Sequence, residues 1–189
     1  QYCGEDHAEI NALRQAGNKS RGADVFVSLE PCTHHGNTGP CTTALLDAQV
    51  KRVVAASHDP NKSVSGNGLE LLNRSGVCAE LAGDDIQRKS VALNPGFFKR
   101  MTCGLPFIRL KMASSMDGRT AAPDSSSRWI TGDSARADVH KLRARSCAIV
   151  TGMGTVRVDN PHLTARLNTD VIQPIRVVVG KCAEINRDA

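Results

Sequence analysis

The chain has 189 residues, of which 40% are hydrophobic and 23% are charged, a balance typical of ordinary soluble globular proteins. The net charge of +5 is modest and no block of Lys and Arg occurs, which argues against a nucleic-acid or membrane surface and suits a phosphorylated small molecule. The sequence shows no signal peptide and no apolar run of membrane-spanning length. Its seven cysteines are an odd number without disulfide-like spacing outside 32–41, so we expect reduced thiols in a cytosolic protein.

The first half of the chain alternates between helical and strand-like patterns. Apolar residues at helical spacing run from residue 7 to Gly17, and DVFVSL at 24–29 alternates and is rich in β-branched and aromatic side chains. Taken in order, the patterns predict helices over 7–16, 40–49, 69–74 and 84–101, and strands over 24–29, 52–57 and 77–81. We expect the last helix to bend near Pro95 and Gly96. Strands that alternate with helices favour a parallel sheet with helices on its faces.

A break that contains Gly and Pro at 102–106 separates this pattern from a second one. The second pattern predicts strands over 107–112, 147–151 and 175–179 and a helix over 133–145. We therefore expect two α/β domains, residues 1–103 and residues 104–189. The chain opens without Met and closes in a polar run shortly after a strand, so both ends look cut.

Two short segments carry the residue types of a metal site: HAE at 7–9 and PCTHHGNTGPC at 31–41. His7 and Glu9 would point to opposite sides of a regular helix, so both can address one ion only from an irregular first turn. Cys41 stands at an expected helix start, where partial positive charge favours a thiolate. We predict a zinc site with a fourth position open to water, held by His7, Cys32 and Cys41.

Glu9 is the spare acid beside this ligand set. Zinc deaminases combine H-x-E with P-C-x-x-C, and their Glu carries protons without binding the metal. Here the second motif is stretched, with eight residues between the two cysteines. In the predicted mechanism zinc activates water, and Glu9 passes protons to the ring nitrogen and the leaving ammonia. The alternatives are a structural zinc site in which His34 or His35 is a fourth ligand, or a chance occurrence of unrelated Cys and His residues.

Further motifs follow in the order of one known family. They are DPN at 59–61, LKMASSMDGRTA at 110–121, WITG at 129–132 and GTVRVDNPHLTAR at 154–166. With HAE and EPCTHHGNTGPC they cover nearly the whole chain. The chain resembles the bifunctional riboflavin biosynthesis enzymes, which fuse a diaminohydroxyphosphoribosylaminopyrimidine deaminase to a 5-amino-6-(5-phosphoribosylamino)uracil reductase.

The resemblance implies a cytidine-deaminase-like three-layer α/β/α domain that lacks its N-terminal strands, followed by the first part of a dihydrofolate-reductase-like α/β domain. The first domain would convert the pyrimidine's 2-amino group to a carbonyl, with Glu9 as proton donor, and the second would reduce the ribosyl side chain with NADPH. The implied substrate contacts are His34, Asn61, Lys111, Ser127, His162 and Arg166. The implied NADPH contacts are Ala113, Trp129, Thr155 and Asp159.

Several implied residues have simpler interpretations. Trp129 could be a core residue, His34 a solvated loop residue and Arg166 a surface residue. The family usually has Lys or Arg where this chain has Asn37, and the change weakens a contact with the substrate's phosphate. The P-N-P-x-V-G motif upstream of HAE and the glycine-rich cofactor segment of the reductase are absent from the sequence, so we expect a fragment.

Three hypotheses of function remain. The first is an enzyme acting on a small-molecule phosphoribosylaminopyrimidine, and the second is a non-catalytic module stabilised by zinc. The third, a deaminase of nucleosides or nucleic-acid bases, is disfavoured because the chain has only six aromatic residues and no basic run for nucleic-acid binding. We expect no nucleic-acid partner and no membrane partner, and the sequence leaves homo-oligomer formation open.

Overall fold

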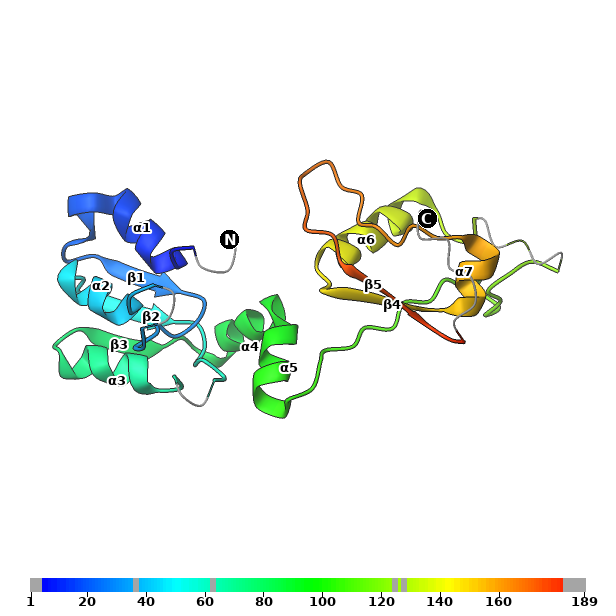
Figure 1. Ribbon diagram of the computed structural model, residues 1–189. Coiled ribbons are helices and arrows are strands. Elements are labelled where there is room, and N and C mark those ends of the chain that lie inside the picture. The colour runs from blue at the N-terminus through cyan, green and yellow to red at the C-terminus, as the bar shows by residue number, and fades with distance from the viewer. Residues whose placement is uncertain (1–4, 36–37, 62–63, 124–125, 127–128, 182–189) are drawn as a thin grey trace. The chain divides into compact units, whose positions relative to one another are not determined.

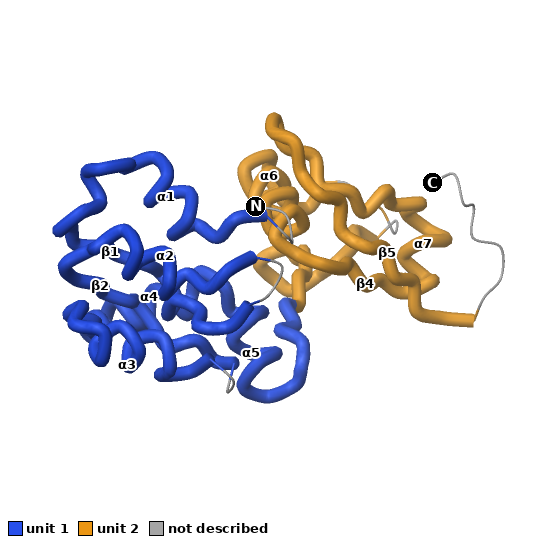
Figure 2. The backbone as a smooth tube through the Cα atoms, turned by 60° about the vertical axis from the view of Figure 1, so that its left-hand side comes forward, with its two compact units in different colours: residues 1–109 blue, residues 110–189 orange. Residues whose placement is uncertain are grey.

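The computed structural model describes residues 5–35, 38–61, 64–123, 126 and 129–181. The chain divides into two compact units, residues 1–109 and 110–189 (Figure 2). This division lies six residues after the predicted domain limit, within an exposed stretch that follows the last helix of unit 1.

Unit 1 alternates helices and strands in the predicted order (Figure 1). Its elements are α1 (Ala8–Ala16), the 3-10 helix η1 (Gly17–Ser20), β1 (Asp24–Val27), α2 (Cys41–Asp47), β2 (Arg52–Ala55), α3 (Asn67–Arg74), β3 (Cys78–Leu81), α4 (Asp84–Leu93) and α5 (Pro95–Cys103). The predicted order is confirmed and η1 is additional. The strands predicted over 24–29 and 52–57 and the helix predicted over 40–49 each end two residues early.

The three strands of unit 1 form a parallel sheet in the order β1-β2-β3. The core lies on one face of this sheet, where Val53 and Ala55 of β2 pack with Leu45 of α2 and with Leu69 and Leu72 of α3. Their burial follows the period of two expected for a sheet with one covered face. The core therefore fixes α2 and α3 against the strands, and the first turns of both helices are held where they can carry a site.

The opposite face of the sheet carries charged residues side by side. The Arg52 guanidinium donates to Glu80 on β3, with Nε 3.0 Å from Oε1, and to Asp24 on β1 at 3.4 Å. The neighbouring Phe26 side chain is 72% exposed among the described residues. This face therefore carries charged side chains together with the apolar side chains of Phe26 and of its β2 partner Val54.

The predicted bent helix over 84–101 is in fact two helices, α4 and α5. Asn94 lies between the two helices and has non-helical backbone angles, φ −137° and ψ 60°. Its side chain caps α5 by accepting a hydrogen bond from the Phe97 N–H at 3.4 Å. The physical reason is Pro95, because a proline disfavours helical geometry in the residue before it while suiting the first position of the next helix. The predicted position of the irregularity is correct, but the helix ends there instead of bending.

Unit 2 contains α6 (Asp133–Ala144), β4 (Ala148–Gly152), α7 (Met153–Asp159) and β5 (Ile175–Val179), and the two strands pair in parallel. The short helix α7 was not predicted, and the other three elements were. Gly180 follows β5 at φ +156°, and a Cβ there would lie 2.6 Å from the Met153 Cβ. Only glycine permits this close approach between the end of β5 and the start of α7.

The prediction of a strand over 107–112 is wrong. These residues form no strand, and Ile108 and Leu110 are each 82% exposed. A strand needs a neighbour to complete its ladder, and no described residue pairs with this segment. Its alternating apolar residues have the pattern of a strand, but no described strand lies beside it to pair with.

The α/β fold class with parallel sheets is confirmed in both units. Among the helices described, none combines the length and apolar character needed to cross a bilayer.

Candidate metal centre and substrate-facing residues

Three predicted ligands converge in unit 1. His7 is the N-cap of α1, Cys41 is the first residue of α2, and Cys32 lies in the loop after β1. The His7 Nδ1 lies 3.2 Å from the Cys41 Sγ and 3.6 Å from the Cys32 Sγ, and all three ligand atoms lie within 4.8 Å of one another. The three residues thus come from separate segments and face a common point.

This donor set fits zinc. Zinc binds His nitrogen and Cys sulfur at about 2.0–2.3 Å in tetrahedral geometry, which places neighbouring ligand atoms roughly 3.5–3.8 Å apart. The two distances from the His7 Nδ1 lie close to this spacing. Two thiolates and one imidazole leave the fourth tetrahedral position for water or substrate, as catalytic zinc sites do.

Backbone groups at the start of α2 hold the Cys32 segment in place. The Cys41 N–H donates to the Cys32 Sγ at 3.3 Å, and the Thr42 N–H and hydroxyl both donate to the Cys32 carbonyl, at 3.2 and 3.1 Å. N–H groups in the first turn of a helix lack partners within the helix and are free for this purpose. Pro40 at the N-cap has extended backbone geometry and directs the chain into this turn.

The two thiols differ in acidity. Hydrogen bonds from the Cys41 thiol and backbone N–H, together with nearby His7, lower the pKa of Cys32 to about 5. The same shared hydrogen bond, burial and the negative charge of Glu9 raise the pKa of Cys41. Metal binding requires both sulfurs as thiolates, so a bound cation would favour loss of the Cys41 proton.

Glu9 occupies the first turn of α1, two residues after His7. It is half-buried, and its carboxylate acts on the Cys41 thiol, which places it beside the ligand cluster. His34 and His35 are exposed, and neither belongs to the cluster of described ligand atoms. Among the described residues, three ligands therefore cluster with the Glu9 carboxylate beside them.

The predicted substrate contact Asn61 lies on the loop after β2. The Asn61 N–H donates to the Asp59 carboxylate at 2.8 Å, which fixes the turn. Burial, with the charge of Glu30 adding to it, raises the pKa of Asp59, whereas nearby His34 lowers it. The Asp59 N–H also donates to Glu30 at 3.4 Å, which links the turn to the residue that precedes Pro31 and Cys32.

Glu30 is a residue that the sequence reasoning missed. It is the last residue before Pro31 and Cys32, its side chain is fully buried, and it accepts five hydrogen bonds from residues 58–69. Burial alone would raise its pKa, but the bonds from the Gly66 backbone, His58 and other donors outweigh this and lower it. The available signal was a carboxylate at the end of an apolar strand, where a buried charge requires built-in partners.

The predicted site residues of unit 2 lie on several segments. Lys111 and Ala113 lie in a segment without helix or strand, and Thr155 and Asp159 are on α7. Trp129 lies in the loop before α6, and His162 and Arg166 lie in the loop before β5. Ser127, like Asn37 in unit 1, lies outside the described residues. His162 and Arg166 lie on the loop between α7 and β5, and Arg166 is exposed there.

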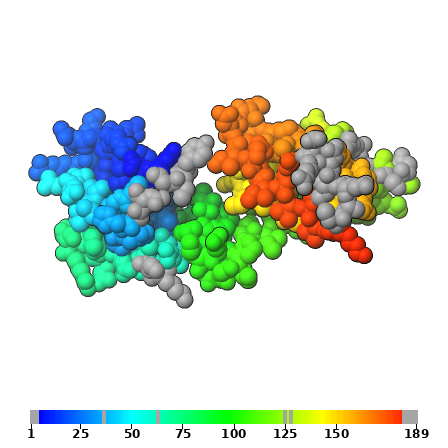
Figure 3. Space-filling view, viewed as in Figure 1, coloured from blue at the N-terminus to red at the C-terminus, as the bar shows by residue number. Residues whose placement is uncertain are grey.

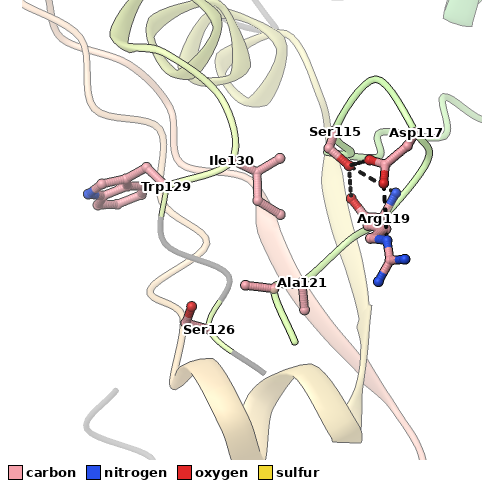
Figure 4. A pocket seen from close by; sticks show the side chains of 8 residues that line it. Ser115, Asp117, Arg119, Ala121, Ser126, Trp129 and Ile130 are labelled. Atoms are coloured by element: carbon pink, nitrogen blue, oxygen red, sulfur yellow. Dashed lines mark hydrogen bonds and ion pairs between the residues drawn. The ribbon is translucent and has the colours of Figure 1, made fainter. Parts of the chain in front are cut away.

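A hollow of about 360 Å³ in unit 2 includes Trp129 in its lining (Figure 4). On its other side Ser115, Asp117 and Arg119 form a hydrogen-bonded turn around Gly118 at φ +81°. Trp129 is 71% exposed, with the Arg136 guanidinium 4.4 Å from its ring centroid, so it is not a core residue. The other predicted NADPH contacts are not part of this lining.

A basic cluster on unit 2 brings together α6 and the loop that precedes β5. Arg143 donates to the Thr164 carbonyl at 3.0 Å and Arg166 to the Thr164 hydroxyl at 3.1 Å, while the Arg166 N–H donates to His140 Nδ1. Burial and then the Arg166 charge lower the pKa of Arg143. Sequence reasoning missed Arg143 because helix surfaces commonly carry arginines.

Comparison with known proteins gives each unit a relative. Residues 1–57 match the zinc-binding region of cytidine and deoxycytidylate deaminases, and residues 106–189 match the RibD C-terminal domain. The chain is 46% identical over 191 residues to riboflavin biosynthesis protein RibD of Escherichia coli, covering 95% of this chain and 52% of that protein. The Mycobacterium tuberculosis RibD is 47% identical over 188 residues, covering 95% and 53%.

Solved structures agree with these relatives. Acinetobacter baumannii RibD superposes with a TM-score of 0.87 at 46% identity, covering 96% of this chain and 52% of that one. Over 95% of its length the chain is therefore similar to RibD proteins. A diaminohydroxyphosphoribosylaminopyrimidine deaminase/5-amino-6-(5-phosphoribosylamino)uracil reductase from Thermotoga maritima gives a TM-score of 0.85 at 40% identity, covering 94% and 50%.

The RibD relatives place the ligand cluster in context. His7, Cys32 and Cys41 all fall within the matched zinc-binding region, so the observed cluster and the comparison point to the same metal. The chain spans about half the length of the curated RibD proteins that it matches.

Proposed function

We propose that unit 1 catalyses the zinc-dependent hydrolytic deamination of 2,5-diamino-6-(5-phosphoribosylamino)pyrimidin-4(3H)-one. In this reaction water replaces the 2-amino group, which leaves as ammonia. We further propose that unit 2 serves the NADPH-dependent reduction of the product, 5-amino-6-(5-phosphoribosylamino)uracil. The similar protein from Thermotoga maritima is named for both a deaminase and a reductase activity, which supports the pairing.

The observation that carries the deaminase proposal is the cluster of three ligands with Glu9 beside it. Zinc in such a site supplies a water nucleophile at neutral pH. Glu9 is the residue placed to hold the proton released by that water, because it belongs to the same helical turn as His7 and does not coordinate. It would return protons to the ring nitrogen and to the departing amine.

In unit 2 we assign Trp129, Ala113, Thr155 and Asp159 to NADPH, which supplies the hydride. Thr155 and Asp159 are four residues apart on α7 and therefore share a face of the helix. The exposed indole of Trp129 offers a flat apolar surface for a ring of the cofactor. These features support the assignment made from the family resemblance.

The basic cluster suits the phosphate that both substrates carry. The side chains of Arg143 and Arg166 meet at Thr164, and no described carboxylate forms an ion pair with either. Guanidinium groups bind phosphate through paired N–H donors. We therefore propose that Arg143 joins the predicted Arg166 in holding the substrate phosphate, with Lys111 and His162 as further contacts.

The deaminase proposal is tested with Glu9→Gln. We expect this variant to keep its zinc and to release ammonia about 10²–10⁴-fold more slowly, because it loses proton transfer and retains the ligands. Glu70→Gln, which changes an exposed carboxylate on α3, is the matched control and should behave as wild type. Ammonia release and zinc content are measured together, with cytidine as the alternative substrate. Undiminished turnover in Glu9→Gln would remove Glu9 from the mechanism, and zinc without any turnover in wild type would favour a non-catalytic module.

The cofactor proposal is tested through the single tryptophan. We expect NADPH to quench Trp129 emission in a saturable titration, because a ring stacked on the indole accepts its excitation. Thr155→Val should weaken this binding, since it removes a hydroxyl from α7, while Thr102→Val on α5 is a control in unit 1. Emission that stays constant as NADPH is added would place the cofactor away from Trp129.

A further inference from the structure

The Glu30 carboxylate joins two segments of the candidate deaminase site. Its Oε1 accepts from the N–H groups of Gly68 at 2.9 Å and Leu69 at 3.2 Å. Its Oε2 accepts from His58 Nδ1 at 2.9 Å, the Gly66 N–H at 2.9 Å and the Asp59 N–H at 3.4 Å. Both oxygens are therefore saturated, and neither has capacity left for a substrate.

One of the joined segments carries a metal ligand. Glu30 directly precedes Pro31 and Cys32, and its own N–H donates to the Ser57 carbonyl at 2.9 Å. The other segment runs from His58 through the Asp59–Asn61 turn to the first turn of α3. The carboxylate thus lies between a metal ligand and the turn that carries the predicted substrate contact Asn61.

The two segments touch directly at Gly68. A Cβ at this position would lie 2.1 Å from the Pro31 carbonyl oxygen and 3.1 Å from the Glu30 Cγ. Contacts this short exclude every side chain, so the first turn of α3 rests on the backbone of the Glu30–Cys32 segment. A small displacement of either segment is therefore transmitted to the other.

We propose that Glu30 is a positioning residue, which fixes the Asp59–Asn61 turn relative to the metal-binding segment and thereby sets substrate affinity. The inference rests on the proposed deaminase function. Glu30 does not touch substrate and acts through the turn that it holds. Loss of its carboxylate leaves buried N–H groups without an acceptor, so the turn moves while the three ligands keep their own supports in α1 and α2.

The experiment compares Glu30→Gln with Glu80→Gln, a matched loss of charge on the open face of the sheet. Glu30→Gln keeps the size of the side chain but replaces one carboxylate oxygen by an NH2 group, which cannot accept the hydrogen bonds of the surrounding N–H groups. We expect it to bind zinc as wild type does and to raise KM for the pyrimidine about tenfold or more, as for loss of a charged hydrogen bond. The change in kcat should be smaller, and Glu30→Asp should recover part of the loss.

A second readout does not depend on turnover. Hydrogen exchange at the Gly66, Gly68 and Leu69 amides should slow in wild type when zinc is added, and this response to zinc should be lost in Glu30→Gln. His58→Ala removes a single, partly exposed donor and should give a weaker version of both effects, which covers the case in which Glu30→Gln fails to fold.

The outcomes separate the two proposals. Wild-type KM together with a normal exchange response in Glu30→Gln overturns the positioning role. A parallel loss of zinc and kcat at constant KM also overturns it, because Glu30 would then support only the metal ligands. If wild type releases no ammonia, the proposed function fails, and the exchange response to zinc still decides whether Glu30 couples the two segments.

Discussion

The two units differ in how their predicted site residues are arranged. In unit 1, His7, Cys32 and Cys41 come from separate segments and meet within 4.8 Å, and backbone N–H groups of α2 hold Cys32 beside Cys41. In unit 2, the predicted NADPH contacts lie on extended chain, on a loop and on α7, and the hollow that contains Trp129 contains none of the others. A metal site is defined by a few ligand atoms at short range, whereas a nucleotide site needs a surface that many segments build.

The units also differ in their cores. The buried cluster of unit 1 includes fully buried Leu45, Val53 and Leu72. The described residues of unit 2 bury few apolar side chains, chiefly Met153, Leu163 and Ala165, and Ile175 and Val179 of β5 are more than 60% exposed. The last described part of the chain, coloured orange to red, lies at the surface in Figure 3. Burial of apolar area is the main source of stability, so unit 1 has the larger internal support.

The largest expected effect tests the convergence of ligands in unit 1. Cys41→Ser should weaken zinc binding by more than about 100-fold, because losing even an outer-shell partner of a ligand costs 10–100-fold. Cys78→Ser removes an exposed thiol on β3 and should leave zinc affinity unchanged. Competition with a coloured chelator measures both. Equal affinities for zinc in the two variants would show that the cluster is not the metal site.

The next effect sharpens the difference between the cores. Leu72→Ala should lower the free energy of unfolding by about 2–5 kcal/mol, since it opens a cavity in a fully buried position. Val158→Ala on α7 of unit 2 changes a side chain that is 80% exposed and should cost less than about 0.5 kcal/mol. Thermal and denaturant unfolding compare them. Similar losses would mean that Val158 is covered in solution.

The smallest effect probes the basic cluster of unit 2. Burial, then the charges of Arg166 and Arg143, lower the pKa of His140 below its ordinary 6.5. Protonation therefore favours the unfolded chain, so the stability contributed by neutral His140 is complete above pH 6.5 and declines as pH falls through the lowered pKa. NMR titration should give a midpoint below 6.5 that rises in Arg143→Met, with His140→Gln assigning the signal. An unchanged midpoint in Arg143→Met would show that Arg143 does not influence the pKa of His140.

The metal ligands could be predicted because their chemistry is local. An imidazole and a carboxylate two residues apart, followed by two cysteines, restrict the function before any fold is known. Most helices and strands followed from periodicity for the same reason. The failures were non-local: the segment 107–112 has a strand pattern but no described partner, and Asn94 ends α4 because of its neighbour Pro95.

Glu30 and Arg143 could not be predicted because their roles depend on remote partners. The donors to Glu30 lie 28 to 39 residues away in the chain, and nothing near Glu30 indicates them. Arg143 meets Arg166 through a loop whose path the sequence does not reveal. The domain limits and the roles of the site residues remain predictions for the experiments above.

The charged row on the open face of the unit 1 sheet bears on how the strands find their alignment. Arg52 stands between Asp24 and Glu80 across all three strands, yet exposed ion pairs of this kind add little to stability. These ion pairs instead distinguish the native strand registry from shifted ones. A shift of one residue in β2 would turn Val53 and Ala55 outward and remove Arg52 from both carboxylates, so misaligned pairings lose hydrophobic and electrostatic contacts together. The row therefore favours the native registry over misaligned ones, and Cys32 follows the strand whose alignment it supports.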